Sequence, residues 1–304
     1  MRIAVLGAAE SWYLQDLRRA AEGIHQVTPL AFTRLAGGVS VGEQGEKRGG
    51  KQGPIAYSGS ESFADYDAIL VRAMPAGSLE QVVFRMDLLG QWEAAGGVVV
   101  NPARAIETAV DKYLALARLH QAGLATPRTL VCQTVDEAME GFRMLGSDIV
   151  LKPLFGAEGR GIARLNDEAL AWRAFKTLEQ LQAVLYLQEF VAHPGFDLRL
   201  FVAGSRVWGM KRCNPDDWRT NVSRGATTEA HEPSEEEVEI ARQAARAVGA
   251  SLAGIDLLPA RDGRRLVLEV NAAPGWRGLA RALKIDVSAI VLQHVQDMAT
   301  RQDR

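Results

Sequence analysis

The sequence predicts an α/β protein that opens with a parallel-sheet domain and continues as two lobes of mixed helices and strands. Three observations support this prediction. Apolar strand patterns alternate with amphipathic helices over residues 1–103, which is typical of a doubly wound parallel sheet. Helix-start signals of the form Ser/Thr-x-x-Glu/Gln recur at Ser78, Thr134 and Ser234, and they mark separate short helices. Apolar runs joined by tight turns fill much of the C-terminal third, which favours antiparallel hairpins there.

Composition and charge argue against several classes of protein. The chain has 304 residues, a formal net charge of −2 and two cysteines, Cys132 and Cys213. A near-neutral charge gives no general attraction to nucleic acid or to an anionic membrane. Two cysteines do not make a disulfide framework, and no apolar run approaches the length of a membrane span. We therefore expect a cytoplasmic protein that binds neither nucleic acid nor membrane.

Residues 1–103 are expected to form the first domain. Its helices should begin after Ser11 and Ser78, and its strands should lie at residues 2–7, 67–72 and 98–100. Residues 36–53 are crowded with Gly, Lys, Glu and Gln, which predicts a surface loop rather than a substrate lid. The fingerprint G-x-G-x-x-G is absent from the first strand–helix junction, which argues against an NAD-dependent oxidoreductase.

Residues 104–186 are expected to form the second domain and residues 187–304 the third. The second should begin with a helix over residues 104–122, and its strands are expected at 129–132, 148–153, 162–165 and 185–191. The third should hold a hairpin, an irregular segment, a helix ending near Gly249, a second hairpin and a C-terminal helix. The first hairpin is expected at 197–203 and 206–213, and the irregular segment at 214–229.

The second hairpin, within residues 254–276, carries the most informative side chains of the chain. Asp256 lies on its first strand, and Glu269 and Asn271 lie two residues apart on its second, so that they share a face. Three oxygen ligands with no His or Cys beside them favour a hard cation such as Mg²⁺. Alternatively, Asp256 only flanks a turn and Glu269 occupies an exposed strand position. The apolar run 266–270 argues against this, because an unpaired carboxylate in a buried strand is costly.

A glycine-rich turn, residues 156–161, lies between two expected strands of the second domain. Gly156, Gly159 and Gly161 would let backbone N–H groups approach an oxyanion, so the turn is either a phosphate cradle or an ordinary hairpin. It is not a Walker A loop, because Gly-Lys-Ser/Thr is missing. Lys152 lies in an apolar strand, where an ammonium needs an anionic partner. Lys112 follows Asp111 at a helix start and by itself reads as a solvated charge.

Further charged and polar side chains follow along the chain. Glu189 ends an apolar strand and either faces solvent or lines an adenine pocket, and Asp197 and Arg199 alternate onto one face of the next strand. The donors after them suit phosphate or carboxylate binding, because Arg forms bidentate contacts with both. A solvated basic loop is the competing interpretation. These donors are Lys211, Arg212, Arg219, Asn221 and Arg224.

Together these motifs resemble the ATP-grasp ligases, in particular the RimK-type branch that joins glutamate to a carboxylate. The resemblance runs from residue 104 to the end, and its most specific stretches are Arg219–Gly225 and Leu268–Gly275. Residues 71–87 and 274–278 look most like the tetrahydromethanopterin:α-L-glutamate ligase subgroup. The other stretches that carry the resemblance are Asp111-Lys112-Tyr113, Val150–Leu154, Gly156–Gly161, Leu187–Phe190, Asp197-Leu198-Arg199, Trp218 and Gly254-Ile255-Asp256.

The resemblance implies an ATP-grasp fold, with two ATP-binding lobes after the N-terminal domain. ATP would phosphorylate a substrate carboxylate, and the amine of L-glutamate would attack the acylphosphate. The cofactors would be ATP and two Mg²⁺ ions, or Mn²⁺ in their place, with Asp256, Glu269 and Asn271 as metal ligands. The phosphoryl group and the oxyanion would be held by Arg212, Arg219, Asn221 and Arg224. The ATP contacts would come from Lys112, Lys152, Gly156, Gly159, Gly161, Gln188, Glu189, Phe190, Asp197, Arg199 and Lys211.

The acceptor is less defined than the chemistry. The subgroup resemblance implies small-molecule substrates, L-glutamate and a pterin cofactor such as tetrahydromethanopterin. Lys211 stands where the ribosomal-protein-modifying members carry an acidic residue, and modification of a protein C-terminus is the alternative activity. A nucleotide-binding regulator without ligase activity is the third interpretation, against which the intact Asp256, Glu269 and Asn271 set argues. We also expect a homo-oligomer; the number of glutamates added and their linkage are left open.

Overall fold

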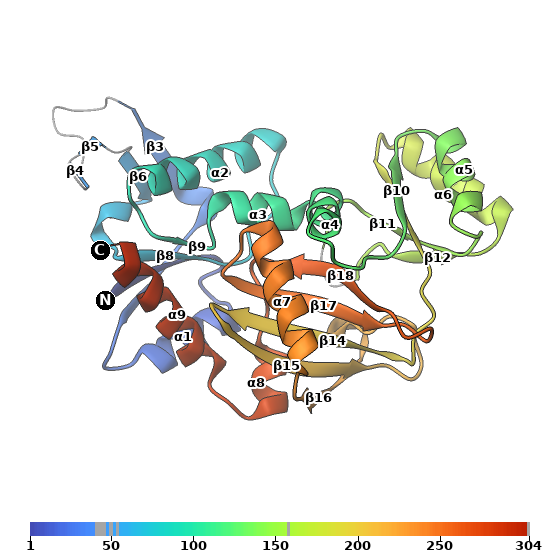
Figure 1. Ribbon diagram of the computed structural model, residues 1–304. Coiled ribbons are helices and arrows are strands. Elements are labelled where there is room, and N and C mark those ends of the chain that lie inside the picture. The colour runs from blue at the N-terminus through green and yellow to red at the C-terminus, as the bar shows by residue number, and fades with distance from the viewer. Residues whose placement is uncertain (40–46, 49–50, 53–54, 157–158, 303–304) are drawn as a thin grey trace.

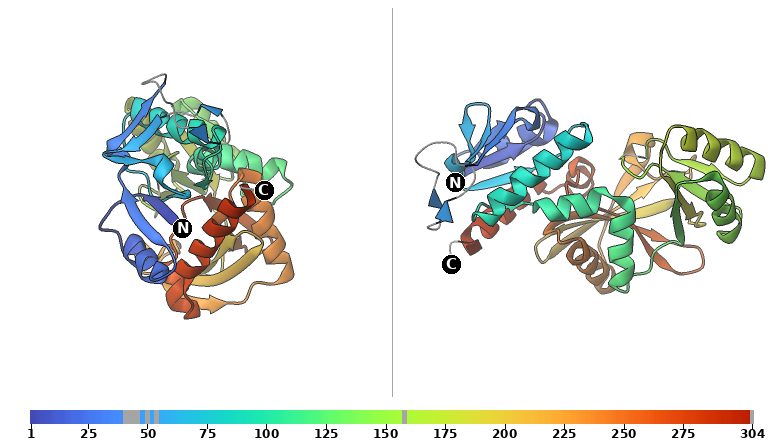
Figure 2. Two further views of the ribbon diagram at one scale, coloured as in Figure 1. Left: turned by 90° about the vertical axis from the view of Figure 1, so that its left-hand side faces the viewer. Right: turned by 90° about the horizontal axis from the view of Figure 1, so that it is seen from above.

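Three main sheets organise the chain in the computed structural model, which describes residues 1–39, 47–48, 51–52, 55–156 and 159–302. Figure 1 shows a parallel sheet of the N-terminal part on the left, a large antiparallel sheet below the centre, and a smaller lobe that projects on the right. Seen from above in Figure 2, the same lobe lies at the end opposite to both termini. The predicted α/β class is confirmed.

The N-terminal sheet has the strand order β2-β1-β8-β9, all parallel. The predicted strands are β1 (Arg2–Leu6), β8 (Ala68–Val71) and β9 (Val99–Val100). The prediction missed β2 (Gln26–Leu30), an edge strand that contains Pro29, because proline is tolerated at an edge but weakens the strand signal. Helices α1 (Trp12–Ala21) and α2 (Leu79–Ala94) begin after Ser11 and Ser78, as predicted, and Ser78 forms a full capping box with Gln81.

A smaller sheet corrects part of the predicted loop 36–53. β3 (Leu35–Gly38) pairs with β6 (Ile55–Ser58), which pairs with β7 (Glu61–Ser62). The loop prediction is therefore wrong for residues 36–38. Farther along, β4 (Lys47–Arg48) pairs with β5 (Lys51–Gln52), and the rest of the predicted loop lies outside the described residues. Two short 3-10 turns, η1 (Phe32–Arg34) and η2 (Phe63–Asp65), complete this part.

The single helix predicted over residues 104–122 is two helices, α3 (Ala103–Val110) and α4 (Lys112–Gln121). Asp111 separates them, and its carboxylate accepts hydrogen bonds from the N–H groups of Tyr113 (2.9 Å) and Leu114 (3.0 Å), so that it caps α4. Both helices pack against α7 (Glu235–Val248) and β18 (Arg265–Asn271). They therefore belong with the third sheet, although they were expected in the second domain.

The projecting lobe is an antiparallel sheet in the order β10-β13-β11-β12. Its strands are β10 (Thr129–Cys132), β11 (Ile149–Lys152), β12 (Ala163–Leu165) and β13 (Leu185–Glu189). Helices α5 (Val135–Met144) and α6 (Glu168–Gln180) pack with the sheet around one apolar cluster. Because β13 pairs with both β10 and β11, this sheet continues through Glu189, past the boundary expected at residue 186.

The third sheet has the order β16-β15-β14-β17-β18. Its strands are β14 (Phe196–Ala203), β15 (Arg206–Cys213), β16 (Thr227–His231), β17 (Leu252–Pro259) and β18. β16 replaces the end of the segment predicted to be irregular, which also contains the turn η3 (Val222–Arg224). Helix α7 covers one face of this sheet (Figure 1), and the C-terminal helix is two helices, α8 (Arg277–Leu283) and α9 (Val287–Gln302). In the described part of the chain, no helix has the length and apolar character needed to cross a bilayer.

Helix α9 and Asn101 both join the N-terminal sheet to the rest of the molecule. Helix α9 packs on α1, and their apolar side chains share a core with β1 and β8. Asn101, fully buried after β9, binds the third sheet. Its Nδ2 donates to the carbonyls of Leu252 (2.6 Å) and Ala272 (2.5 Å), and its Oδ1 accepts from the N–H groups of Ser251 (2.9 Å) and Leu252 (3.0 Å). One amide side chain thus holds the start of β17 beside the end of β18.

Asn101→Ala should lower the free energy of unfolding by about 3 kcal/mol, because buried backbone groups lose their hydrogen-bond partners. Thermal unfolding measures this loss. Gln293→Ala is the control: it removes an exposed hydrogen bond to Asp297 and should change stability by less than about 0.5 kcal/mol. Equal melting temperatures for the two variants would contradict the role of Asn101.

Candidate active site

One face of the third sheet gathers the charged residues that the sequence singles out. The strand register places Asp197 opposite Arg212, and Asp256 opposite both Arg199 and Glu269. Asn271 follows on this face, opposite Gly254. The alternate residues of the same strands, among them Leu198, Leu200, Ile255 and Leu257, share an apolar core with α7. Because neighbours along a strand point to opposite faces, the apolar pattern that seats α7 also directs the charges away from it.

A β-bulge in β18 lies next to Glu269 and affects the direction of its side chain. Asp256 pairs with Glu269, but the next residue, Leu257, pairs with Val267, so Leu268 has no partner in the ladder. Such a bulge bends the strand and redirects its side chains. Leu268 lines a cavity together with Asp256 and Glu269. The bulge thus places an apolar wall beside the carboxylate pair.

Asp256 is buried between two guanidinium groups. Its Oδ2 accepts a hydrogen bond from Arg199 Nη2 (3.0 Å) and lies 3.0 Å from Arg212 Nη2. Burial acts to raise the pKa of Asp256, but Arg199 and Arg212 outweigh it and hold that pKa below its usual value. Its Oδ1 lies 2.5 Å from Arg199 Nε but accepts no hydrogen bond. One oxygen of an ionised carboxylate is therefore left without a hydrogen bond.

Glu269 faces the same point from β18. Burial and the charge of Asp256 raise its pKa, while Lys112, Arg199 and Lys152 act in the opposite direction. Two carboxylates held together in this way favour a bound divalent cation, because the cation removes their repulsion. No cluster of three His, Cys, Asp or Glu side chains suited to a metal ion exists among the described residues. The predicted set has two carboxylates and one amide, and oxygen donors of this kind fit Mg²⁺.

Two lysines approach the carboxylate pair from the other elements. Lys152, at the end of β11, donates a hydrogen bond to Gln188 Oε1 (2.6 Å). Burial lowers its pKa to about 8, against an opposing effect of Glu269. Lys112, the first residue of α4, donates to the carbonyls of Gly156 (2.7 Å) and Leu154 (3.4 Å), and burial lowers its pKa as well. Among the described residues, neither ammonium group has a carboxylate within ion-pair distance, so phosphate oxygens are suitable partners for them.

The glycine-rich turn approaches the third sheet through its described residues. Gly156, Gly159 and Gly161 all have positive φ angles, 146°, 68° and 71°, which glycine adopts without strain. A Cβ on Gly159 would lie 2.5 Å from Asn221 Oδ1, and Arg224 Nη2 donates to the Gly159 carbonyl (3.4 Å). The turn thus lies against Asn221 and Arg224, which follow β15. Residues 157–158, which the phosphate-cradle prediction also includes, lie outside the described residues.

A cavity of about 100 Å³ lies where β11 and β13 face the third sheet. Its apolar walls include Val150, Ile162, Leu258 and Leu268, which suit a planar base. Its lining brings together ten of the predicted site residues, all polar or charged except Phe190: Lys152, Gln188, Glu189, Phe190, Asp197, Arg212, Arg219, Asn221, Asp256 and Glu269. A nucleotide needs this combination of apolar and charged walls.

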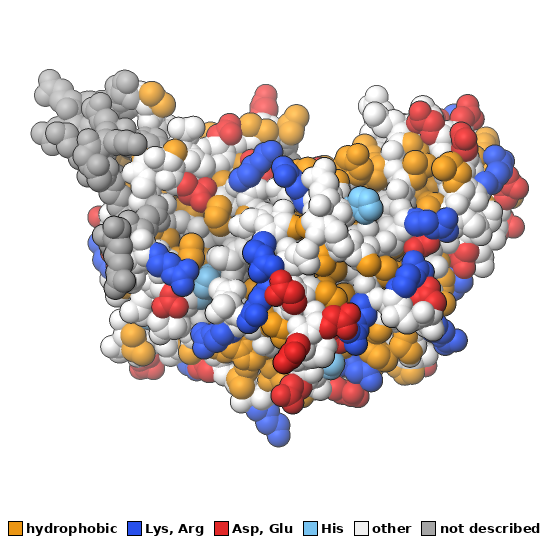
Figure 3. Space-filling model, in the orientation of Figure 1, with side chains coloured by type: hydrophobic (Ala, Val, Ile, Leu, Met, Phe, Trp, Pro, Cys, Tyr) orange, Lys and Arg blue, Asp and Glu red, His pale blue; other side chains and the backbone are white. Residues whose placement is uncertain are grey.

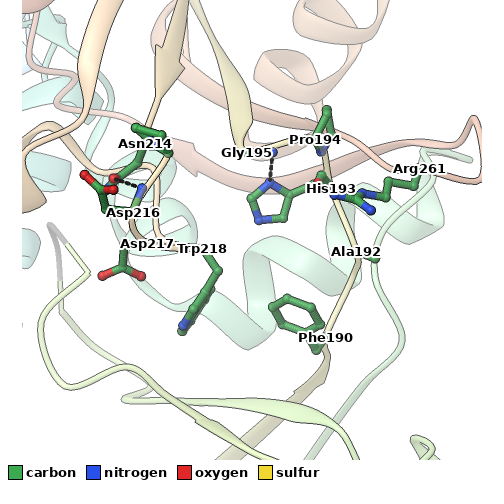
Figure 4. A pocket seen from close by; sticks show the side chains of 11 residues that line it. Phe190, Ala192, His193, Pro194, Gly195, Asn214, Asp216, Asp217, Trp218 and Arg261 are labelled. Carbon is green, nitrogen blue, oxygen red and sulfur yellow. Dashed lines mark hydrogen bonds between the residues drawn. The ribbon is translucent and has the colours of Figure 1, made fainter.

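A second cavity of about 480 Å³ adjoins the first and shares Phe190, His193 and Trp218 with it. Figure 4 shows these three rings around its floor, with Asp216 and Asp217 on one side and Arg261 on the other. The Phe190 and Trp218 rings meet edge to face, with centroids 5.8 Å apart. His193 and Arg261 were not among the predicted site residues, because a single His or Arg outside any motif does not indicate a binding role.

The comparisons with known proteins agree with this geometry. The RimK-like ATP-grasp domain family matches residues 109–295. The chain belongs to the RimK-like ATP-grasp family. It is 35% identical over 270 residues to the tetrahydromethanopterin:α-L-glutamate ligase of Methanosarcina acetivorans, covering 79% of this chain and 83% of that one. The corresponding ligase of Methanococcus maripaludis is 31% identical over 245 residues, 79% and 82% of the two chains.

Solved ATP-grasp structures share the whole architecture. The ATP-grasp ligase PsnB, solved with a phosphomimetic precursor variant, Mg and ADP, superposes with a TM-score of 0.74 at 25% identity, over 98% of both chains. A RimK domain ATP-grasp protein from Sphaerobacter thermophilus, at 20% identity and a TM-score of 0.69 over 97% of this chain and all of that one, supports the fold alone. The predicted ATP-grasp fold and the predicted ATP-dependent carboxylate–amine ligase are thus confirmed.

Lys211 corrects one predicted nucleotide contact of this ATP-grasp site. It pairs across the strands with Leu198 and Glu229, so its side chain leaves from the face opposite to that of Arg212. Its Nζ lies 4.2 Å from the ring centroid of Phe196 and 4.0 Å from Glu229. The prediction treated Lys211-Arg212 as one basic pair, although neighbours in a strand cannot share a face.

Three other predicted contacts have protein partners in this structure. Glu189 binds Arg128 through the backbone N–H (3.1 Å) and Nε (2.7 Å), and its pKa is lowered because Arg128 outweighs the effect of burial. Asp197 binds Arg212 through both oxygens, at 2.7 and 2.5 Å. Arg219 holds Asp217, with its Nη2 at 2.6 Å. These carboxylates therefore position cations beside the cavity, a role that the sequence analysis missed.

Lys152→Met should weaken binding of a non-hydrolysable ATP analogue roughly 10- to 100-fold, because a charge-assisted phosphate contact is lost. Calorimetry measures this change. Lys211→Met is the matched control, since Lys211 lies on the other face of the sheet, and should leave the affinity unchanged. Equal affinities for both variants would remove Lys152 from the phosphate site.

The same contact should make nucleotide binding depend on pH. The pKa of Lys152 is about 8 because of burial, so its ammonium is charged below that pH and neutral above it. Affinity for the ATP analogue should therefore fall as the pH rises from about 7 to about 9. Lys152→Arg should flatten this dependence, because guanidinium stays charged throughout. A wild-type affinity that does not change over this range would contradict the assignment.

Proposed function

We propose that this ATP-grasp ligase joins L-glutamate to a carboxylate of a small pterin cofactor such as tetrahydromethanopterin. The observation that carries the ligase chemistry is the pairing of buried Asp256 with half-buried Glu269, beside two lysines that have no carboxylate partner among the described residues. The pterin acceptor is supported by the names of the two methanogen relatives. The products would be an amide, ADP and phosphate.

The proposed roles follow from position. Lys112 and Lys152 bind the phosphates of ATP, and the turn with Gly156, Gly159 and Gly161 lies beside them. The base lies between Val150 and Leu258, next to Gln188, Glu189 and Phe190. Asp197 orients Arg212, and Arg199 orients Asp256. Arg212, Arg219, Asn221 and Arg224 neutralise the transferred phosphoryl group and the oxyanion that forms when the amine attacks.

Asp256, Glu269 and Asn271 would hold two Mg²⁺ ions, or Mn²⁺ in their place. When bound, such ions would supply charge neutralisation for the phosphates of ATP. Asp256 Oδ1 is suitable for this because it is ionised, buried and accepts no hydrogen bond. We assign no general base. The carboxylates that line the cavity bind arginine side chains or belong to the proposed metal site, and the ring of His193 packs beside Phe190, with centroids 6.5 Å apart.

A peptide or protein acceptor is the second candidate. The observation that favours it is the likeness to PsnB, which was solved with precursor peptides and covers nearly the same length as this chain. The open cavity of about 480 Å³ beside the nucleotide cavity offers space for either acceptor. We further propose that the enzyme is a cytoplasmic homo-oligomer.

An ADP-release screen with L-glutamate separates the candidates. The acceptors are tetrahydromethanopterin, folates, a deazaflavin coenzyme and short acidic peptides. We expect ADP release only with a pterin, with a product heavier by one or more glutamyl residues in the mass spectrum. Glutamylated peptide with unchanged pterin would favour the second candidate. ADP release with none of these acceptors would contradict both.

Glu269→Gln should lower turnover by roughly 10²-fold or more, because the neutral amide holds a divalent cation poorly. Steady-state ADP release measures this loss. Glu239→Gln is the control, since Glu239 forms only an exposed ion pair with Arg246, and should retain wild-type turnover. Wild-type turnover by Glu269→Gln would refute the metal assignment.

A further inference from the structure

Arg72 is a buried cation at the carboxyl end of the parallel sheet. It follows the last residue of β8 and is 8% exposed. A Cβ on Gly7, just after β1, would lie 3.1 Å from the Arg72 Cβ, so Arg72 lies where two neighbouring strands end. In open α/β sheets this edge is where ligands bind. No residue of the nucleotide cavity comes from this sheet, so the position has no role in the chemistry described above.

The guanidinium of Arg72 has few of the partners that such a group needs. Its Nη2 donates to the carbonyl of Pro274 (2.8 Å), but Nε and Nη1 are buried without a hydrogen bond. Among the described residues, no carboxylate forms an ion pair with it. Arg212, which is buried to a similar degree, binds both Asp197 and Asp256. A buried charge without an anion is costly, which indicates that Arg72 is shaped for an anion from outside the chain.

Two aromatic rings hold this guanidinium in place. Its Cζ lies 4.3 Å from the Trp276 ring centroid and 4.8 Å from that of Tyr13. Trp276 is fully buried, and its Nε1 donates to Ser288 Oγ (3.0 Å), which in turn donates to Asp16 (2.6 Å). Tyr13 is only half-buried. A ligand would therefore reach Arg72 from the side of Tyr13, while Trp276 keeps the guanidinium fixed.

Pro274 connects Arg72 to the metal-binding face. Its carbonyl binds Arg72, and its Cβ lies 3.0 Å from the place that a Cβ on Gly254 would take. Arg199 Nη1, whose guanidinium binds Asp256, lies 2.8 Å from the same place. Asn271, the third proposed metal ligand, pairs with Gly254. Arg72 is thus connected, through Pro274 and Gly254, to the strand pair that carries Asp256 and Asn271.

We propose that Arg72 binds a substrate carboxylate that takes no part in bond formation. The proposal rests on the proposed function, in which L-glutamate reacts through its amine and keeps two carboxylates, and in which the acceptor is itself an acid. A planar guanidinium is suited to a carboxylate because it offers several N–H donors in a fixed geometry. Tyr13 and Trp276 would then form the walls of this carboxylate subsite, between the first domain and the third sheet.

Arg72→Met tests the subsite, because Met keeps the apolar contacts with the rings and removes the charge. We expect the KM for L-glutamate or for the acceptor to rise roughly 10- to 100-fold, with the KM for ATP unchanged. A rise for L-glutamate assigns the carboxylate to the amine substrate, and a rise for the acceptor assigns it to the acid. Unchanged KM values for both overturn the proposal.

Two further measurements separate a binding role from a structural one. Arg85→Met is the matched control, since Arg85 is also buried and also donates to a loop carbonyl, that of Pro75 (2.9 Å); it should lower the melting temperature without changing either KM. Arg72→Lys serves if Arg72→Met fails to fold. It keeps the charge without the planar group, so both KM values remaining at wild-type level would again overturn the proposal.

A binding measurement keeps this proposal distinct from the proposed function. Calorimetry with L-glutamate and with each acceptor of the screen, in the presence of a non-hydrolysable ATP analogue, needs no turnover. Binding to the wild type that is lost in Arg72→Met supports the subsite even if no acceptor gives ADP, in which case only the proposed function fails. Binding that Arg72→Met retains overturns the subsite even if the ligase reaction proceeds. No binding to the wild type overturns the subsite as well.

Discussion

The charge balance around Asp256 and Glu269 is the constraint on which the rest of this site depends. The two carboxylates lie opposite each other on adjacent strands in a buried face, where their repulsion and burial raise the pKa of Glu269. Arg199 and Arg212 keep Asp256 ionised, and two lysines stand on the other side of the cleft. A face with this arrangement is suited to a cation and a polyphosphate together, because each offsets the charge that the other brings.

The sheet makes this balance possible by fixing which side chains meet. A shift of one residue in the pairing of β14 with β17 would place Arg199 and Asp256 on opposite faces. Apolar residues facing α7 prevent such a shift, since they would have to leave the core. Asn101 adds a second restraint, because it binds backbone groups at the start of β17 and at the end of β18. On the face that Figure 3 shows, acidic and basic side chains are interspersed.

Much of the fold could be predicted from local signals. The caps at Ser78 and Ser234 and the hairpin that carries Asp256 and Glu269 depend on neighbouring residues, so the sequence defines them. Strand pairing, by contrast, brings together residues that are far apart in the sequence. The place of β13 between β10 and β11 and the contact of Glu189 with Arg128 depend on such long-range pairing. The opposite orientations of Lys211 and Arg212, by contrast, follow from the alternation of side chains along a strand. The prediction was wrong there because it treated two adjacent basic residues as one phosphate site.

The location of Arg72 suggests how chemistry and selectivity are divided in this fold. The groups that we propose to bind ATP lie mainly on the third sheet and the projecting lobe. Arg72 comes from the first domain, and the rings around it come from α1 and from the start of α8. The packing of α9 on α1 and the hydrogen bonds of Asn101 to β17 help to hold these elements together. If Arg72 binds a substrate carboxylate, as we propose, changes at this junction should alter which acid or amine binds while the proposed phosphate-binding face keeps its geometry.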